Sequence, residues 1–435
     1  MTGGTKMSNS ESLEYLNQAR YFVGVEQYDN ALEYINKAIV VDKLNKELYV
    51  QKSIILANLD RYSEAIQELN KALKIDKAYA EAYFHLGNLY LMTGEQAVGI
   101  ENYNKAIAYG FDDSQIFFNM GLLYEEEDND ELAIRNYTKA ILKDPLRADA
   151  RVRKAKIFIA NGKQQEALET LDELILADPD LYDGYHLKAL LLADMGKLDE
   201  AMVVLDEARR LFPKDPSFLI DKVNIFVMRE QADEAKKLIR VLESDYEMEL
   251  DQKRHLELEK ARLYALEANL DKIIDSLLNA KAYSKEIDAT DIDVEATFLL
   301  TNCYLEKKDY SAAINCSKEL ITSDELSYAI PSYYTLPYAY AQLGEKEKAK
   351  SQYKESISKL RAITLNNPEI LDGYLFRALC LKEVGQYEKA LELSDYLLKI
   401  DQSSNTFHSL KAEVLYAMGD EDGAKAEKAV AESLI

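Results

Sequence analysis

Apolar and small residues recur along this chain at the spacing of three and four that places them on one side of a helix. Within residues 114–147, one such set marks a first helical face: Phe117, Met120, Gly121 and Tyr124. A second set follows an acidic break: Ala133, Tyr137 and Ala140. Pro145 then ends the unit, because proline cannot continue a helix. The pattern predicts two antiparallel helices, helix A and helix B, joined by a short turn.

The same unit recurs at a step of 34 residues. The small residue early in helix B gives the positions Ala31, Ala65, Gly99, Ala133, Ala167, Ala201 and Ala235. The partner position in helix A follows the same step: Ala19, Ser53, Gly87, Gly121, Ala155, Ala189 and Val223. We expect the two small residues of each unit to let its helices pack closely. Seven regular units are therefore predicted over residues 12–249.

Beyond residue 249 the step lengthens, and the sequence predicts five irregular units over residues 250–435. The last helix B, residues 423–435, is expected to cap the array. Residues 1–11 lack the repeat pattern and are expected to form a disordered N-terminal tail. We expect distorted packing at three places: 243–253, 284–293 and 360–370.

This unit resembles the tetratricopeptide repeat (TPR), a helix–turn–helix with a large residue and glycine in helix A, alanine in helix B and a closing proline. The resemblance covers nearly the whole chain. It implies an all-α fold, a right-handed α-solenoid superhelix of about 12 tandem repeats. Because one helix pair cannot bury both its faces, neighbouring pairs are expected to stack into a continuous core.

The charge balance limits the classes of partner. The chain carries 53 basic and 77 acidic residues, a formal net charge of −24, so we expect no nucleic-acid partner. No apolar run approaches the length of a membrane span, and the N-terminus has no apolar signal core. We therefore expect no membrane association and a cytoplasmic location. In a reducing cytosol the three cysteines, which form no CxxC motif, need no special role.

Residues that carry catalysis are not grouped in the sequence. The four histidines fall in different repeats, and no two have the spacing of metal ligands: His85, His186, His255 and His408. No glycine-rich phosphate loop or nucleophile elbow is present. Since every long segment belongs to a repeat, we predict that the protein is not an enzyme and that it has no metal or cofactor.

The resemblance therefore implies a protein–protein interaction adaptor that holds a segment of another protein in a concave groove. A first alternative is a peptide-sensing regulator of a response-regulator pathway, although such proteins carry a further domain before the repeats. A second alternative is a self-assembling structural spacer that makes contacts through its ends. An adaptor alone is expected to be a monomer or a weak homo-oligomer, so a size measurement separates the adaptor from the self-assembling spacer.

A strip of polar residues is the main candidate site. The sixth residue of each of the first five repeats can donate a hydrogen bond: Asn17, Gln51, His85, Asn119 and Arg153. Asn88 and Lys156 lie three residues beyond two of them, and the resemblance places the whole strip on the inward face. Amide donors at regular spacing can hold the unpaired carbonyls of an extended peptide. The ordinary alternative is a helix face that needs polar residues where it meets water.

The same strip bears on the chemistry of the partner. Arg153 and Lys156 form a local positive site that suits a carboxylate. Asn88, Asn119 and Arg153 also occupy three of the five positions of the TPR clamp that grips the C-terminal carboxylates of chaperone tails, but the two lysines of that clamp are absent. We expect the partner to be a protein or peptide with an exposed carboxylate or basic residues.

Aromatic residues are further candidates. Phe84 and Phe118 are expected to supply an apolar floor beside the polar strip. In the tenth repeat Pro337 stands inside helix A, where it removes a backbone hydrogen bond and predicts a kink. Tyr334 and Tyr338, four residues apart, are expected to face the groove and to stack on a ligand. The alternative is a tolerated kink with ordinary tyrosine packing.

Overall fold

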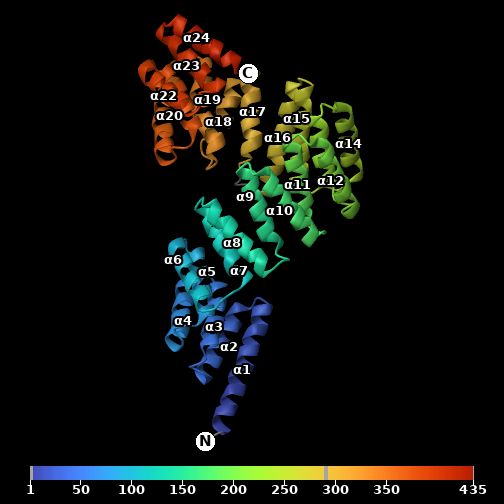
Figure 1. The fold of residues 1–435 in the computed structure, drawn as a ribbon, viewed down its shortest axis with the longest axis vertical. Coiled ribbons are helices and arrows are strands. Elements are labelled where there is room, and N and C mark those ends of the chain that lie inside the picture. The colour runs from blue at the N-terminus through green and yellow to red at the C-terminus, as the bar shows by residue number, and fades with distance from the viewer. Residues whose placement is uncertain (1–2, 289–291, 435) are drawn as a thin grey trace. The chain divides into compact units, whose positions relative to one another are not determined.

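The computed structural model describes residues 3–288 and 292–434, which form 24 helices. No β-strand occurs in these two ranges. These helices follow one another as helix A and helix B of twelve repeats, and contacts between the two helices of a repeat run from α1 to α10 and from α13 to α24 (Figure 1). The all-α fold and the number of repeats predicted from the sequence are thereby confirmed.

The chain divides into two compact units, Met1–Val204 and Leu205–Ile435. The helices that begin in the first unit are α1 (Gly3–Gly24), α2 (Tyr28–Val41), α3 (Lys46–Ala57), α4 (Tyr62–Ile75), α5 (Ala80–Met92), α6 (Gln96–Ala108), α7 (Ser114–Glu126), α8 (Asp130–Lys143), α9 (Ala148–Ala160), α10 (Gln164–Ala177), α11 (Tyr182–Asp194) and α12 (Leu198–Leu211). The boundary between these two compact units falls within α12.

The second unit includes four longer helices, α15, α16, α19 and α20. Its elements are α13 (Ser217–Met228), α14 (Ala232–Asp245), α15 (Leu250–Leu266), α16 (Leu270–Ile287), α17 (Val294–Glu306), α18 (Tyr310–Leu320), α19 (Leu326–Gln342), α20 (Lys346–Asn366), α21 (Leu371–Glu383), α22 (Tyr387–Ile400), α23 (Asn405–Met418) and α24 (Glu421–Ser433). The extra turns of α15, α16 and α20 account for the longer steps of these repeats. Of the three places where distortion is expected, 284–293 includes residues 289–291, which lie outside the described residues.

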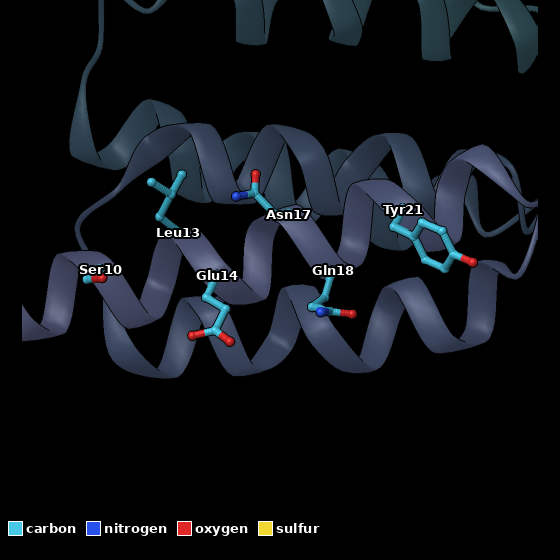
Figure 2. Close-up of a pocket in the computed structure, with 6 residues that line it drawn as sticks. All are labelled: Ser10, Leu13, Glu14, Asn17, Gln18 and Tyr21. Carbon is cyan, nitrogen blue, oxygen red and sulfur yellow. The ribbon is translucent and has the colours of Figure 1, made fainter.

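The first helix differs from the expectation for the N-terminus. α1 begins at Gly3, so it includes residues 3–11, which the sequence analysis assigns to a disordered tail. No proline or glycine interrupts the chain between Lys6 and Glu11, so nothing in the covalent structure stops a helix there. Leu13 and Tyr21 of this helix are exposed (Figure 2).

Helices A of successive pairs also contact each other. Within the first unit these contacts join α3 to α5 and α9 to α11; within the second they join α13 to α15, α17 to α19, α19 to α21 and α21 to α23. Helices A therefore share one side of each unit. We call this side the A face, formed by α1, α3, α5, α7, α9 and α11 in the first unit and by α13, α15, α17, α19, α21 and α23 in the second.

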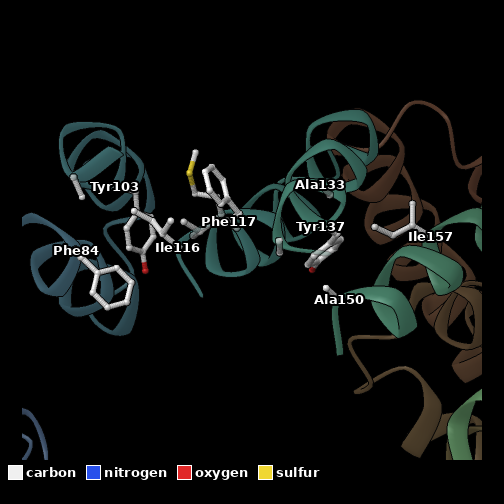
Figure 3. Packing of buried hydrophobic residues seen from close by; sticks show 12 residues of the cluster. Phe84, Tyr103, Ile116, Phe117, Ala133, Tyr137, Ala150 and Ile157 are labelled. Atoms are coloured by element: carbon white, nitrogen blue, oxygen red, sulfur yellow. The ribbon is translucent and has the colours of Figure 1, made fainter. Parts of the chain in front are cut away.

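Within a pair, a glycine of helix A accommodates a tyrosine ring of helix B. A Cβ atom added to Gly121 would meet the ring of Tyr137 at 2.5 Å, and one added to Gly87 would meet the ring of Tyr103 at 2.4 Å. Both tyrosines are fully buried in one core cluster that runs from α5 to α9 (Figure 3). The small residues predicted to allow close packing thus allow a helix to lie directly on an aromatic ring.

The turn between helix A and helix B carries one residue with positive φ in every repeat. These residues follow the 34-residue step through Glu26, Asp60, Gly94, Asp128, Gly162, Gly196 and Glu230, then longer steps through Ala268, Lys308, Gly344 and Gly385, and a last regular step to Gly419. A left-handed residue at the end of a helix lets its last carbonyl groups find partners. Six of these twelve residues are not glycine, so the turn conformation is not visible as a glycine pattern in the sequence.

Replacing Ala268 by glycine is expected to stabilise the protein. Ala268 has φ +50° and is exposed, so its Cβ adds left-handed strain without any packing contact that would offset it. Glycine should remove about 1 kcal/mol of that strain. The control is Ala265→Gly in the last turn of α15, which should cost about 1 kcal/mol because glycine weakens a helix. Urea unfolding of both variants checks the opposite signs, and a loss of stability in Ala268→Gly would contradict this account of the turn.

Candidate functional site

A pocket of about 280 Å³ opens on the A face of the first unit, between α3 and α5. Its walls combine apolar and polar side chains: Ser53, Ile54, Ala57, Asn58, His85, Asn88, Leu89 and Met92. Two residues of the predicted polar strip, His85 and Asn88, therefore line the same pocket. Asn58 and Met92 are not among the predicted site residues, although each stands at the end of a helix A, one turn beyond the polar strip.

Asn88 presents unused hydrogen-bond donors in this pocket. Its Oδ1 accepts from the Tyr103 hydroxyl at 2.6 Å and from Asn119 Nδ2 at 2.9 Å. Burial raises the pKa of Tyr103 to about 12, so its hydroxyl stays protonated as the donor, although the bond from Asn119 acts in the opposite direction. Within the described residues the Asn88 amide nitrogen makes no hydrogen bond. Both of its N–H groups are therefore available to a ligand.

His85 completes the polar part of the pocket as a neutral imidazole. Burial lowers its pKa below the ordinary histidine value, against a weaker opposite effect of Glu81. Its ring lies edge-on to Phe84, with centroids 5.2 Å apart. A neutral imidazole has one donor and one acceptor nitrogen, so it can pair with either group of a peptide bond.

Asn119 has no free N–H group for a ligand, because its side-chain amide already donates to Asn88 and Tyr103. Its Nδ2 donates to Asn88 Oδ1 at 2.9 Å and to the Tyr103 hydroxyl at 3.2 Å, while its Oδ1 accepts from Gln115 Nε2 at 2.7 Å. Gln115 Oε1 in turn accepts from Arg147 Nη2 at 2.8 Å. This polar chain fixes the orientation of the Asn88 amide. Gln115 was missed by the sequence analysis, and its signal is the spacing of four from Asn119 on α7.

Arg153 and Lys156 differ in their partners. Arg153 Nη1 lies 3.2 Å from Glu125 Oε1, and the other oxygen of that carboxylate accepts from the Tyr137 hydroxyl at 2.5 Å. Lys156 is exposed and forms no ion pair within the described residues. The positive site on α9 is therefore mainly the ammonium group of Lys156, with Arg153 partly neutralised.

Asn17 and Gln51 are not brought together with the other strip residues. Asn17 is exposed on α1, in a shallow depression of about 550 Å³ whose lining residues all come from that helix (Figure 2). Gln51 is half-buried on α3 and does not line the pocket between α3 and α5. The five predicted donors therefore do not form one continuous strip. His85 lines the pocket and Asn119 belongs to an internal hydrogen-bond network. Asn17 and Arg153 are exposed at the two ends, and Gln51 is half-buried outside the pocket.

The expectation of an apolar floor formed by Phe84 and Phe118 requires a correction. Phe84 is buried, and its ring stacks on Phe111 with centroids 4.5 Å apart, because the A/B contact needs a large apolar side chain there. Phe118 is half-buried under the guanidinium of Arg147, which lies 4.4 Å from the ring centroid. Phe84 is therefore a core residue, and Phe118 is already covered by a cation of the same chain.

Tyr334 and Tyr338 lie together on α19. Their rings are stacked with centroids 6.0 Å apart and planes 24° apart. Both side chains are half-buried, whereas Pro337, between them, is buried. The helix continues through Pro337 and through a second proline, Pro331.

Residues 3–288 and 292–434 contain no grouped metal ligands, no helix able to span a membrane and no paired cysteines. Within those ranges no three His, Cys, Asp or Glu side chains are grouped as the ligands of a metal ion. None of the helices there combines the length and the apolar character that crossing a membrane requires. The three cysteines are unpaired thiols, and burial raises the pKa of each: Cys303, Cys316 and Cys380.

Comparison with family models and solved structures gives similarities of one kind. A model described as TPR repeat matches residues 55–94, and two described as tetratricopeptide repeat match residues 118–182 and residues 80–109, 182–215 and 330–358. YrrB, described as a TPR protein with an unusual peptide-binding site, is 22% identical, with 41% of this chain and 92% of that chain covered and a TM-score of 0.35. No curated protein matches the sequence.

Two further solved structures cover more of the chain. A tetratricopeptide repeat protein from Parabacteroides merdae is 15% identical, with 59% of this chain and 98% of that chain covered and a TM-score of 0.44. The C-terminal part of a TPR repeat-containing protein from Cytophaga hutchinsonii is also 15% identical, with coverage of 63% and 96% and a TM-score of 0.43.

Proposed function

The chain belongs to the tetratricopeptide-repeat family, and from this premise we propose that it is an adaptor whose first unit binds an extended segment of another protein on its A face. Proteins of this family generally mediate protein–protein interactions. Their helical repeat is typically a scaffold for binding and not for catalysis.

The observation that carries the proposal is the pocket between α3 and α5. An extended polypeptide offers one carbonyl group and one side chain at each residue. The free N–H groups of Asn88 can donate to such a carbonyl, and the apolar wall of Ile54, Leu89 and Met92 can receive an aliphatic side chain. Because Asn88 is held by Tyr103 and Asn119, it is oriented before the ligand arrives, which reduces the entropy lost on binding.

Lys156 extends the proposal along the A face of the first unit. Its ammonium is exposed on α9 with no ion pair in the described residues, in a protein of net charge −24. A carboxylate of the bound segment, at its C-terminus or on a side chain, suits this position. We therefore expect a segment that combines an aliphatic side chain with an acidic group.

Asn88→Asp tests this proposal with little change of shape. The carboxylate keeps an oxygen for Tyr103 and Asn119 but removes both free donors and repels a carbonyl oxygen. The variant should lose about 1–3 kcal/mol of binding free energy for the partner. Partners are captured from the native cytosol on the wild-type protein, identified by mass spectrometry and then titrated with each variant.

The matched control is Asn70→Asp on α4. Asn70 is exposed on a helix B and donates to Ile66 O at 2.9 Å, so the same substitution there adds the same charge outside the A face. It should leave the affinity unchanged. If Asn88→Asp binds the captured partner as tightly as the Asn70→Asp control, the pocket is not the binding site.

A further inference from the structure

Helix α19 has an unusual composition for this chain. Its 17 residues, LSYAIPSYYTLPYAYAQ, contain five tyrosines and no Asp, Glu, Lys or Arg, whereas 30% of the whole chain is charged. Every other helix A contains Asp, Glu, Lys or Arg. The absence of charge on this helix therefore calls for a physical reason beyond solvation.

The aromatic rings of α19 form a cluster with those of the next helices. Tyr334 lies at its centre, with ring centroids 6.0 Å from Tyr338, 6.1 Å from Tyr353 on α20 and 6.4 Å from Phe376 on α21. Tyr353 is buried, while Tyr338 and Phe376 are half-buried. We call Tyr334, Tyr338, Tyr353 and Phe376 the aromatic cluster. Tyr338 and Phe376 are its accessible edge.

This edge lies on the A face of the second unit. Tyr338 follows Pro337 directly, as Asn88 follows Gly87, and both Pro337 and Gly87 are buried at the small position of helix A. Tyr338 therefore has the repeat position that lines the pocket of the first unit. Phe376 belongs to the next helix A, and α19 and α21 are in contact.

Two carboxylates accompany the cluster. Glu383 on α21 and Glu413 on α23 are exposed, and a single ammonium, that of Lys382, lies 3.3 Å from Glu383 and 2.7 Å from Glu413. Burial raises the pKa of Tyr334, and the charges of Glu383 and Glu413 raise it further. Glu383 follows Phe376 by seven residues, two turns along the same face of α21, and α21 contacts α23, which carries Glu413. One lysine does not neutralise both carboxylates.

The first unit shows how this chain covers an equivalent ring. Phe118 and Tyr334 have the same repeat position, three residues before Gly121 and Pro337. Arg147, the N-cap residue of α9, places its guanidinium 4.4 Å from the centroid of Phe118. The corresponding N-cap residue of α21 is Ile370. Within the described residues no cation lies over Tyr334, Tyr338 or Phe376.

We propose that the aromatic cluster, with Glu383 and Glu413 beside it, binds an arginine side chain of a partner polypeptide. The partner's guanidinium would lie against Tyr338 and Phe376 and donate to the two carboxylates. Arginine suits this site better than lysine because its planar, weakly hydrated guanidinium stacks on aromatic faces and pairs with carboxylates through two N–H groups. The inference rests on the proposed role in polypeptide binding, but it uses a different unit and a different chemistry from the Asn88 pocket.

The probe for this site is a fluorescein-labelled peptide, acetyl-(Gly-Arg)₄-amide, titrated with the full chain by fluorescence anisotropy at physiological ionic strength. Two matched probes replace arginine by lysine, which keeps the charge, and by citrulline, which keeps the shape without the charge. We expect the arginine probe to bind more tightly than the lysine probe, and the citrulline probe to bind least. Equal binding of the citrulline probe would overturn the proposed cation site.

Variants separate the site from the general acidity of the protein. Tyr338→Leu keeps an apolar contact but removes the aromatic face, and Glu383→Gln with Glu413→Gln removes the carboxylates. Each change should weaken binding of the arginine probe about tenfold. The controls are Tyr21→Leu, at an exposed tyrosine of α1, and Glu388→Gln with Glu392→Gln, which remove the same charge from the exposed side of α22.

The outcomes distinguish the two proposals. If the Glu388/Glu392 control weakens binding as much as the Glu383/Glu413 variant, the probe senses only net charge and the site is wrong. If Tyr338→Leu binds the arginine probe as the wild type does, the aromatic cluster is not the site. The Asn88 pocket is tested with its own captured partner and the Asn70→Asp control, so a failure of that pocket and a failure of the aromatic cluster are read independently.

Discussion

Gly121→Ala is expected to destabilise the α7/α8 pair, although alanine is a better helix former than glycine. The added Cβ would lie 2.5 Å from the ring of Tyr137, well inside van der Waals contact. Overpacking of this kind costs about 1–3 kcal/mol, whereas the gain in helix propensity is about 1 kcal/mol. The steric cost exceeds the gain when the ring cannot move.

The surroundings of Tyr137 hold its ring in place. Its side chain is fully buried among residues of α7, α8 and α9, and its hydroxyl donates to Glu125 Oε2 at 2.5 Å (Figure 3). A shift of the ring would break this bond and open a void elsewhere, because the interior is closely packed. The net loss of stability should therefore lie near the upper part of the range given above.

The control for this prediction is Gly24→Ala. Gly24 ends α1, and a Cβ atom there would meet nothing within 4 Å. Alanine at this position should leave stability unchanged or raise it by up to about 1 kcal/mol. Because each repeat contacts only its neighbours, the loss in Gly121→Ala should appear as faster hydrogen exchange in α7 and α8. Unchanged hydrogen exchange in α7 and α8 would contradict the prediction, because it would show that the pair accommodates the added Cβ with no loss of stability.

The fold follows from features that the sequence displays directly. Gly121 and Ala133 recur with their equivalents at fixed positions because close helix contacts exclude larger side chains, and this recurrence predicts each helix pair. The left-handed residue of each turn is not visible in the same way. Glu26 and Ala268 tolerate that conformation because the packing of both flanking helices imposes it, so no residue type marks the position.

The candidate site was predicted less completely, because repeat position tells which face a residue occupies and not whether its hydrogen bonds are already used. Asn88 and Asn119 both lie on the A face, yet only Asn88 keeps free donors. At the position equivalent to Asn119, the eighth repeat has Glu259, which is fully buried and is held by Asn224 and Arg262 at distances of 2.5–3.1 Å. The same face can therefore present a polar group or bury it, depending on its neighbours.

Arg254→Met is expected to cost about 3–5 kcal/mol, because it leaves a buried carboxylate without its cation. The side chain of Asp293 is fully buried, and Arg254 reaches both its oxygens, with Nε at 2.7 Å and Nη2 at 3.0 Å. Ser284 Oγ and the amide of Ala296 donate to it at 2.7 Å and 3.0 Å. Methionine fills the volume of the arginine stem but supplies no donor, so the loss is electrostatic.

The loss of stability in Arg254→Met should depend on pH, whereas a loss caused by poor packing would not. Burial acts to raise the pKa of Asp293, but the hydrogen bonds from Arg254, Ala296 and Ser284 hold it below its ordinary value. In the wild type the Asp293 contribution is therefore present above the unfolded pKa of about 3.9 and is lost as the pH falls through the lower folded value. Without Arg254, burial should raise the folded pKa above the unfolded one.

In Arg254→Met the Asp293 carboxyl should therefore favour the folded state more, and not less, as the pH falls. A buried carboxylate with a raised pKa binds a proton more readily in the folded state, so the stability deficit of Arg254→Met should shrink as the pH is lowered from 7 towards about 4.5. Urea unfolding across this range measures the deficit, and hydrogen exchange in α15 to α17 locates it. A control, Arg254→Met with Asp293→Asn, replaces the buried charge by a neutral amide and should remove most of the pH dependence. A deficit in Arg254→Met that is independent of pH would mean that the arginine acts through packing, and that Asp293 is not the group left unpaired.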